Sequence, residues 1–135
     1  HLAGYDLSAA MLAKAKEKSV YDLLGKADIA TLRTEAAADL VTAADVLNYF
    51  GGLETVFRNI RAMLRNGGIF AFTVENWRDN QGFELQDSRR YRHSETYVRQ
   101  ALEDAGFAEF QCATAELRRD RDEPVEGLIV TCRAA

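Results

Sequence analysis

Short apolar runs alternate with segments of helical period along this chain, which is typical of an α/β domain with a mostly parallel sheet. Residues 2–6 predict a first strand. Ser8 can then cap a helix that fades near Lys18, because apolar positions recur there at three- and four-residue steps. Residues 21–25 predict a second, weaker strand, and the polar stretch 31–38 has room for a short helix.

The clearest amphipathic helix lies in the middle of the chain, after a predicted buried strand at residues 39–44. The residues Asn66, Gly67 and Gly68 predict a left-handed stop for this helix, and residues 69–74 predict a strand rich in β-branched and aromatic side chains. The apolar face of the helix consists of Leu53, Val56, Phe57, Ile60, Met63 and Leu64.

The last third of the chain begins with a polar segment, residues 76–92, that has no clear period and predicts a long connection. Ser94 then opens a further helix, which Gly106 ends. Residues 107–117 and 125–132 predict two strands joined by a charged turn, and this arrangement favours an antiparallel pair.

Composition narrows the functional classes. The 135 residues carry 17 basic and 21 acidic side chains, a net charge of −4, and 47% are hydrophobic. These values favour one globular domain and disfavour a general nucleic-acid binder. The longest apolar runs are too short to cross a membrane, so a cytoplasmic setting is the default expectation.

The two cysteines match no metal-ligand spacing, so we expect no metal site. Cys112 and Cys132 would lie roughly opposite one another in the predicted antiparallel pair. Two buried thiols are the favoured interpretation, and a cross-strand disulfide is the less favoured alternative.

Acidic or amide side chains follow the predicted strands. A carboxylate at the carboxyl end of a parallel strand can accept hydrogen bonds from the two hydroxyls of a ribose, and ligands of open α/β sheets bind at these ends. Asp and Asn also favour turns and caps, which is the stronger explanation for any one position taken alone. The residues concerned are Asp6, Asp28, Asp45, Asn48, Glu75 and Asn76.

An ordered series of motifs resembles class I S-adenosylmethionine-dependent methyltransferases. Residues 4–8, with Met11 and Leu12, look like the second strand and following helix of that family. Residues 39–49 and 65–75 follow its fourth strand, helix and fifth strand in order. The resemblance implies a Rossmann-like methyltransferase fold, with a mostly parallel sheet and an antiparallel C-terminal strand pair.

A narrower resemblance points to a bacterial group of these enzymes often joined to tetratricopeptide repeats, although no such repeat occurs in these residues. It is carried by Arg92-His93-Ser94 with Tyr97, Ala105-Gly106-Phe107, and residues 125–128.

The family's first strand and its glycine-rich loop have no counterpart in residues 1–135. We therefore expect a single methyltransferase-like domain, residues 1–135, that is an N-terminally truncated fragment. The missing strand would leave two strand edges unpaired, which predicts completion by upstream residues, or strand exchange or a dimer in the fragment.

The resemblance implies roles on the cofactor side. Asp6 would bind the ribose hydroxyls, Leu7 would lie beside the adenosine and Met11 would pack on the adenine. Asp28 and the backbone of Ile29 would recognise the adenine edge. A small residue, Ala44, would let the next strand end pass close to the cofactor. Packing in the helix core is nearly as good an explanation for Met11. A turn role is an equally good explanation for Asp28.

On the acceptor side, His93 is the one internal histidine and a candidate catalytic base, since its ordinary pKa is near 6.5. A cap or a surface residue is the alternative. The side chains of Asn48, Tyr49, Glu75 and Trp77 could line the acceptor pocket, and half-buried packing is an equally good explanation for Tyr49 and Trp77. The arginine-rich stretches 89–92 and 118–121 are interpreted as solvated faces, because acids are interleaved with them.

These patterns together predict an S-adenosylmethionine-dependent methyltransferase with an unidentified acceptor, a small molecule rather than nucleic acid, and an inactive fragment. The alternative is a non-catalytic binding or regulatory module that kept the fold. A nicotinamide-dependent oxidoreductase fits less well, because its glycine fingerprint is also absent from these residues.

Overall fold

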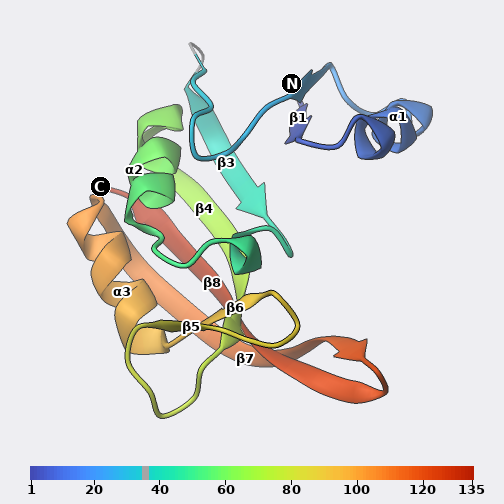
Figure 1. The fold of residues 1–135 in the computed structure, drawn as a ribbon. Coiled ribbons are helices and arrows are strands. Elements are labelled where there is room, and N and C mark those ends of the chain that lie inside the picture. The colour runs from blue at the N-terminus through green and yellow to red at the C-terminus, as the bar shows by residue number, and fades with distance from the viewer. Residues whose placement is uncertain (35–36) are drawn as a thin grey trace. The chain divides into compact units, whose positions relative to one another are not determined.

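The chain forms two compact units, residues 1–34 and 35–135, in a computed structural model (Figure 1). The structure describes residues 1–34 and 37–135. The short helix predicted within residues 31–38 falls partly on residues 35–36, outside the described residues, and the described part of that stretch is not helical.

The first unit is a parallel βαβ unit built from β1 (Ala3–Asp6), α1 (Ala9–Glu17) and β2 (Leu23–Lys26). The predicted cap is confirmed, because the Ser8 hydroxyl accepts a hydrogen bond from the Met11 N–H at 3.2 Å. The helix has no buried residue. Two short strands and one helix are too small to enclose an apolar core by themselves.

The second unit is built on a sheet of six strands among the described residues. β8 pairs antiparallel with β4 from Ile69 to Glu75, so β3 and β6, both parallel to β4, lie along its other edge. β5 pairs with β6, and β7 forms the opposite border beside β8. The strands are β3 (Ala38–Ala43), β4 (Leu64–Asn76), β5 (Phe83–Leu85), β6 (Tyr91–His93), β7 (Phe107–Asp120) and β8 (Glu123–Ala134).

Two helices, α2 (Glu54–Met63) and α3 (Glu95–Asp104), contact each other and pack on β4 and β7 (Figure 1). A one-turn 3₁₀ helix, η1 (Leu47–Tyr49), precedes α2. The core between helices and sheet is aromatic: the Phe70 and Phe72 rings stack at 4.5 Å, and Phe57 packs against both. None of the helices within residues 1–34 and 37–135 has the length and apolar character needed to span a membrane.

The helix α2 ends one or two residues earlier than the sequence predicts, before the stop expected at residues 66–68. The helix ends at Met63, and β4 begins at once with Leu64, which pairs with Ala38. The register then shifts before Leu40 pairs with Ile69. Gly67 has a φ of +79°, so the predicted left-handed residue is present, but it serves this irregularity inside the strand rather than the helix end.

The predicted long connection at residues 76–92 contains a hairpin, β5 with β6. The residues Phe83 and Tyr91 contribute ring contacts at 6.0 Å. Strands of three residues show too little alternation to be recognised in a sequence, and these two depend on the sheet beside them.

The predicted antiparallel pair near the C-terminus is confirmed, but the pairing of the cysteines is wrong. Cys112 pairs with Val130, not with Cys132, because the pairing starts at Asp120 with Glu123 beside the turn and the extra residue Leu117 in β7 shifts it one position further from Cys132. Both thiols are free, and the disulfide is not formed. Burial raises the pKa of Cys132 to about 12.

Candidate functional site

Asp6 is the last residue of β1 and is oriented by the turn that leads into α1. Its Oδ1 accepts a hydrogen bond from the Ser8 N–H at 2.8 Å. The other carboxylate oxygen, Oδ2, has no hydrogen bond within the described residues. The turn therefore orients a carboxylate with one oxygen left to accept hydrogen bonds from a ligand.

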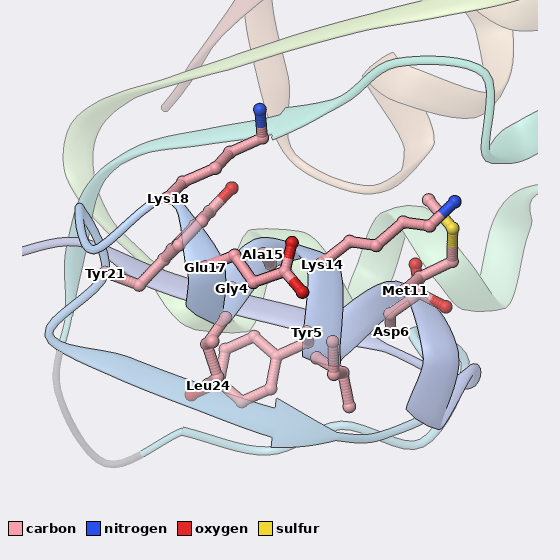
Figure 2. A pocket seen from close by; sticks show the side chains of 11 residues that line it. Gly4, Tyr5, Asp6, Met11, Lys14, Ala15, Glu17, Lys18, Tyr21 and Leu24 are labelled. Carbon is pink, nitrogen blue, oxygen red and sulfur yellow. The ribbon is translucent and has the colours of Figure 1, made fainter.

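A cavity of about 620 Å³ lies in the first unit, and Figure 2 shows that Asp6 and Met11 both line it. The side chains of Leu7 and Met11 are 60% and 52% exposed, so apolar surface adjoins the carboxylate. A carboxylate oxygen that has no hydrogen bond among the described residues, beside apolar surface, fits the ribose and purine of an adenosine. The remaining lining residues are Gly4, Tyr5, Leu12, Lys14, Ala15, Glu17, Lys18, Tyr21 and Leu24.

Asp28 follows β2 and builds a turn. Its Oδ1 accepts from the Ala30 N–H at 2.8 Å, and its carbonyl oxygen accepts from the Leu32 N–H at 2.8 Å. Asp28 therefore has the turn role that was one of its two interpretations. Its other carboxylate oxygen, Oδ2, has no hydrogen bond among the described residues. Ile29 lies within this turn, and Ala44, in the second unit, directly follows β3 and is exposed.

A polar network joins the ends of β3 and β4 in the second unit. The Arg118 guanidinium binds Asp45 Oδ1 and Glu75 Oε2, both at 2.7 Å. Asp45 Oδ1 also accepts from Asn48 Nδ2 at 2.9 Å, and Glu75 Oε1 accepts from Gln86 Nε2 at 3.3 Å. Two predicted acceptor-side residues, Asn48 and Glu75, are therefore brought together through residues of other elements.

Arg118 is the residue of this network whose burial the sequence analysis did not predict. The interleaved charges predict a solvated face for residues 118–121, but the Arg118 side chain is only 20% exposed and is held between two carboxylates. Its neighbour Arg119, 61% exposed beside Glu116, does match the prediction. The alternating charges along this hairpin do not indicate which of the two arginines is buried and which is exposed.

The other two predicted acceptor-side residues lie nearer the surface. Tyr49 is 59% exposed, and its hydroxyl raises the pKa of the Arg90 guanidinium. Trp77 follows β4, and the Arg92 guanidinium lies 5.7 Å from its ring centroid, a cation–π contact. The sequence pattern does not predict that Asp45, Gln86 and Arg90 lie near these residues.

His93 ends β6 and is 0% exposed. One ring nitrogen, Nε2, lies 2.9 Å from the carbonyl oxygen of Gly51. The other, Nδ1, is buried and has no partner in the described residues. Burial lowers the pKa of His93 and outweighs the opposing effects of the Gly51 and Phe50 backbone and of the charges of Glu75 and Glu54. Its catalytic role stays a prediction.

No group of three or more metal-ligating side chains occurs in residues 1–34 and 37–135.

Comparison with known families gives a match to the first half of the chain. A family model described as a methyltransferase domain matches residues 1–70, just over half of the chain. A comparison with curated proteins finds no match.

Many solved structures share the fold. An S-adenosylmethionine-dependent methyltransferase from Mesorhizobium loti superimposes with a TM-score of 0.71 at 21% identity, over 98% of this chain and 80% of that one. The N-methyltransferase NodS from Bradyrhizobium japonicum, solved with S-adenosyl-L-homocysteine, gives 0.70 at 20% identity, over 99% and 66%. A possible histamine N-methyltransferase from Thermotoga maritima gives 0.73 at 13% identity, over 99% and 73%. The predicted Rossmann-like fold is confirmed.

Proposed function

The chain belongs to the methyltransferase-domain family, and we propose that it transfers a methyl group to a small-molecule acceptor. The cofactor is S-adenosylmethionine. The observation that carries the proposal is Asp6, a carboxylate oriented by Ser8 at the end of β1, within the residues that match the family model. A strand-end acid of this kind is what a ribose requires.

Asp6 Oδ2 would accept hydrogen bonds from the ribose hydroxyls, and Leu7 and Met11 would cover the adenosine with apolar surface. Asp28 would accept from the adenine amino group while the Ile29 backbone donates to the ring. The cofactor supplies an electrophilic methyl carbon on a sulfonium, which an acceptor attacks in line. The protein mainly orients the acceptor and excludes water, and Ala44 would leave room at the end of β3.

The acceptor would bind at the ends of β3 and β4, where Asn48, Tyr49, Glu75 and Trp77 lie. Two carboxylates, Asp45 and Glu75, face one shared guanidinium there. Arg90 lies beside Tyr49. These opposite charges nearly balance, which supports a compact polar acceptor over a polyanionic nucleic acid.

A cytoplasmic setting is also part of the proposal, and in such a reducing compartment the free thiols Cys112 and Cys132 would stay reduced.

Calorimetric titration of S-adenosylhomocysteine into the intact protein tests the cofactor part of the proposal. Incubation with methyl-labelled S-adenosylmethionine and fractionated small molecules then tests the acceptor part. We expect binding, and label in a small-molecule fraction but not in added RNA. Binding without any transfer would favour a non-catalytic module, and no binding by a folded protein would refute the cofactor assignment.

A further inference from the structure

The segment between η1 and α2, residues 50–53, is held by side chains from a distant part of the sequence. His93 Nε2 lies 2.9 Å from the Gly51 carbonyl oxygen. The Tyr97 hydroxyl accepts a hydrogen bond from the Leu53 N–H at 2.8 Å and donates one to Glu54 at 2.9 Å. Both ends of the segment are therefore tied to β6 and α3.

Close packing adds to these bonds. A Cβ on Gly51 would lie 2.8 Å from Phe83 Cε2 and 2.9 Å from Tyr91 Cε1, so only glycine fits between the two rings. The His93 and Tyr97 rings stack with centroids 6.0 Å apart. We call the four side chains that hold the segment, Phe83, Tyr91, His93 and Tyr97, the aromatic clasp.

The partners of His93 determine its tautomer. A carbonyl oxygen can only accept, so Nε2 must carry the proton and donate it to Gly51. Nδ1 is then the nitrogen with the lone pair, and it is buried without a partner in the described residues. The imidazole thus presents a donor to the backbone and no exposed lone pair with which to take a proton from an acceptor.

We infer that His93 is a positioning residue: its Nε2–H holds the Gly51 carbonyl, and the aromatic clasp thereby fixes the turn that carries Asn48 and Tyr49. That turn directly precedes the held segment, and Asn48 Nδ2 binds Asp45 at 2.9 Å within the network at the ends of β3 and β4. The use of this turn in acceptor binding rests on the proposed function, while the clasp itself does not.

Backbone hydrogen exchange tests the inference without any acceptor. The variants are His93→Gln, whose amide keeps an N–H donor but cannot titrate, and His93→Leu, which keeps bulk and removes the donor. The amides of Tyr49, Phe50 and Leu53 report on the segment. We expect exchange about five- to tenfold faster in His93→Leu, the factor for one lost hydrogen bond, and rescue in His93→Gln.

The amide of Val130, in the middle of β8, serves as the internal reference, because it lies in another part of the unit and should exchange at an unchanged rate. Tyr97→Phe keeps the ring and removes the hydroxyl that accepts from Leu53, so it should reproduce the local effect even if His93→Leu fails to fold.

A ¹⁵N spectrum of the imidazole should show a neutral Nε2–H tautomer between about pH 6 and 8. Equal exchange in all variants, a uniform rise that includes Val130, or an Nδ1–H tautomer would overturn the inference. Because none of these measurements uses methyl transfer, failure of the proposed function leaves their outcome unaffected.

Discussion

The side chain of Leu117, in β7, occupies the position where Gly127, in β8, has no side chain. A Cβ on Gly127 would lie 2.8 Å from Leu117 Cδ2, with Cγ and Cδ1 closer still. Leu117 is the extra residue of a bulge, since Glu116 pairs with Glu126 and Arg118 pairs with Val125.

This contact bears on the polar network because Gly127 also pairs with Glu75 of β4. Paired residues of neighbouring strands point to the same face of a sheet. A side chain on Gly127 would therefore displace Leu117 on the face of the sheet to which Glu75 belongs, and Glu75 forms an ion pair there with Arg118, the residue after Leu117.

The change Gly127→Ala should destabilise the protein by about 1–3 kcal/mol, the usual cost of overpacking. In a Leu117→Ala background the same change should cost clearly less, because the obstructing side chain is gone. Urea unfolding of the four proteins of this cycle measures the coupling. Equal costs in both backgrounds would show that the Leu117 contact is not what excludes a side chain.

Loss of the Arg118 side chain should leave Glu75, which is 5% exposed, without its cation. We expect Arg118→Met to cost about 3 kcal/mol in the free energy of unfolding, because an unpaired buried carboxylate is strongly unfavourable. Adding Glu75→Gln should recover part of that loss.

Arg119→Met is the matched control for Arg118→Met, since its exposed pair with Glu116 should contribute about 0.5 kcal/mol or less. Similar losses for the two arginine variants in thermal or urea unfolding would contradict the buried network.

Stability should fall in mild acid because of His93. Burial lowers its pKa below the usual value in the folded state, although the backbone of Gly51 and Phe50 and the charges of Glu75 and Glu54 act in the opposite direction. Protons then bind the unfolded chain more strongly, so this contribution to stability is complete above about pH 6.5 and declines as the pH falls below it.

To isolate this contribution, the unfolding free energies of the wild type and of His93→Gln are compared as the pH falls below about 6.5. The difference between the two proteins should change with pH in the direction given, since glutamine does not titrate. Parallel pH profiles would show that His93 keeps an ordinary pKa.

Replacement of Asp6 separates its two roles. Asp6→Asn keeps an oxygen for the Ser8 N–H and removes the charge, whereas Asp6→Ala removes both. If Asp6 binds the ribose, Asp6→Ala should weaken S-adenosylhomocysteine binding by about 1–3 kcal/mol, and Asp6→Asn by less. Calorimetry measures both.

Asp104→Ala, an exposed acid near the end of α3, is the control for the Asp6 variants and should bind as the wild type does. Unchanged affinity in Asp6→Ala would mean that another group binds the ribose.

Elements with local signals were predictable from the sequence. The helix α1 begins after Ser8 and α3 after Ser94, and Gly106 adopts the left-handed φ of +93° expected after α3. These features depend on hydrogen bonds and backbone angles within one or two turns. The main strands and their succession along the chain were likewise predictable, from apolar runs and from the resemblance to the family.

The sequence by itself therefore determined the fold class, the helix caps and the acids at the strand ends. Only the tertiary structure decided that Arg118 is buried between Asp45 and Glu75, that Cys112 does not oppose Cys132, and that His93 binds the backbone of Gly51. Each of these depends on a register shift or a contact between residues at least 20 positions apart. One inserted residue in a strand changes which side chains meet, and no local pattern in these residues shows where it occurs.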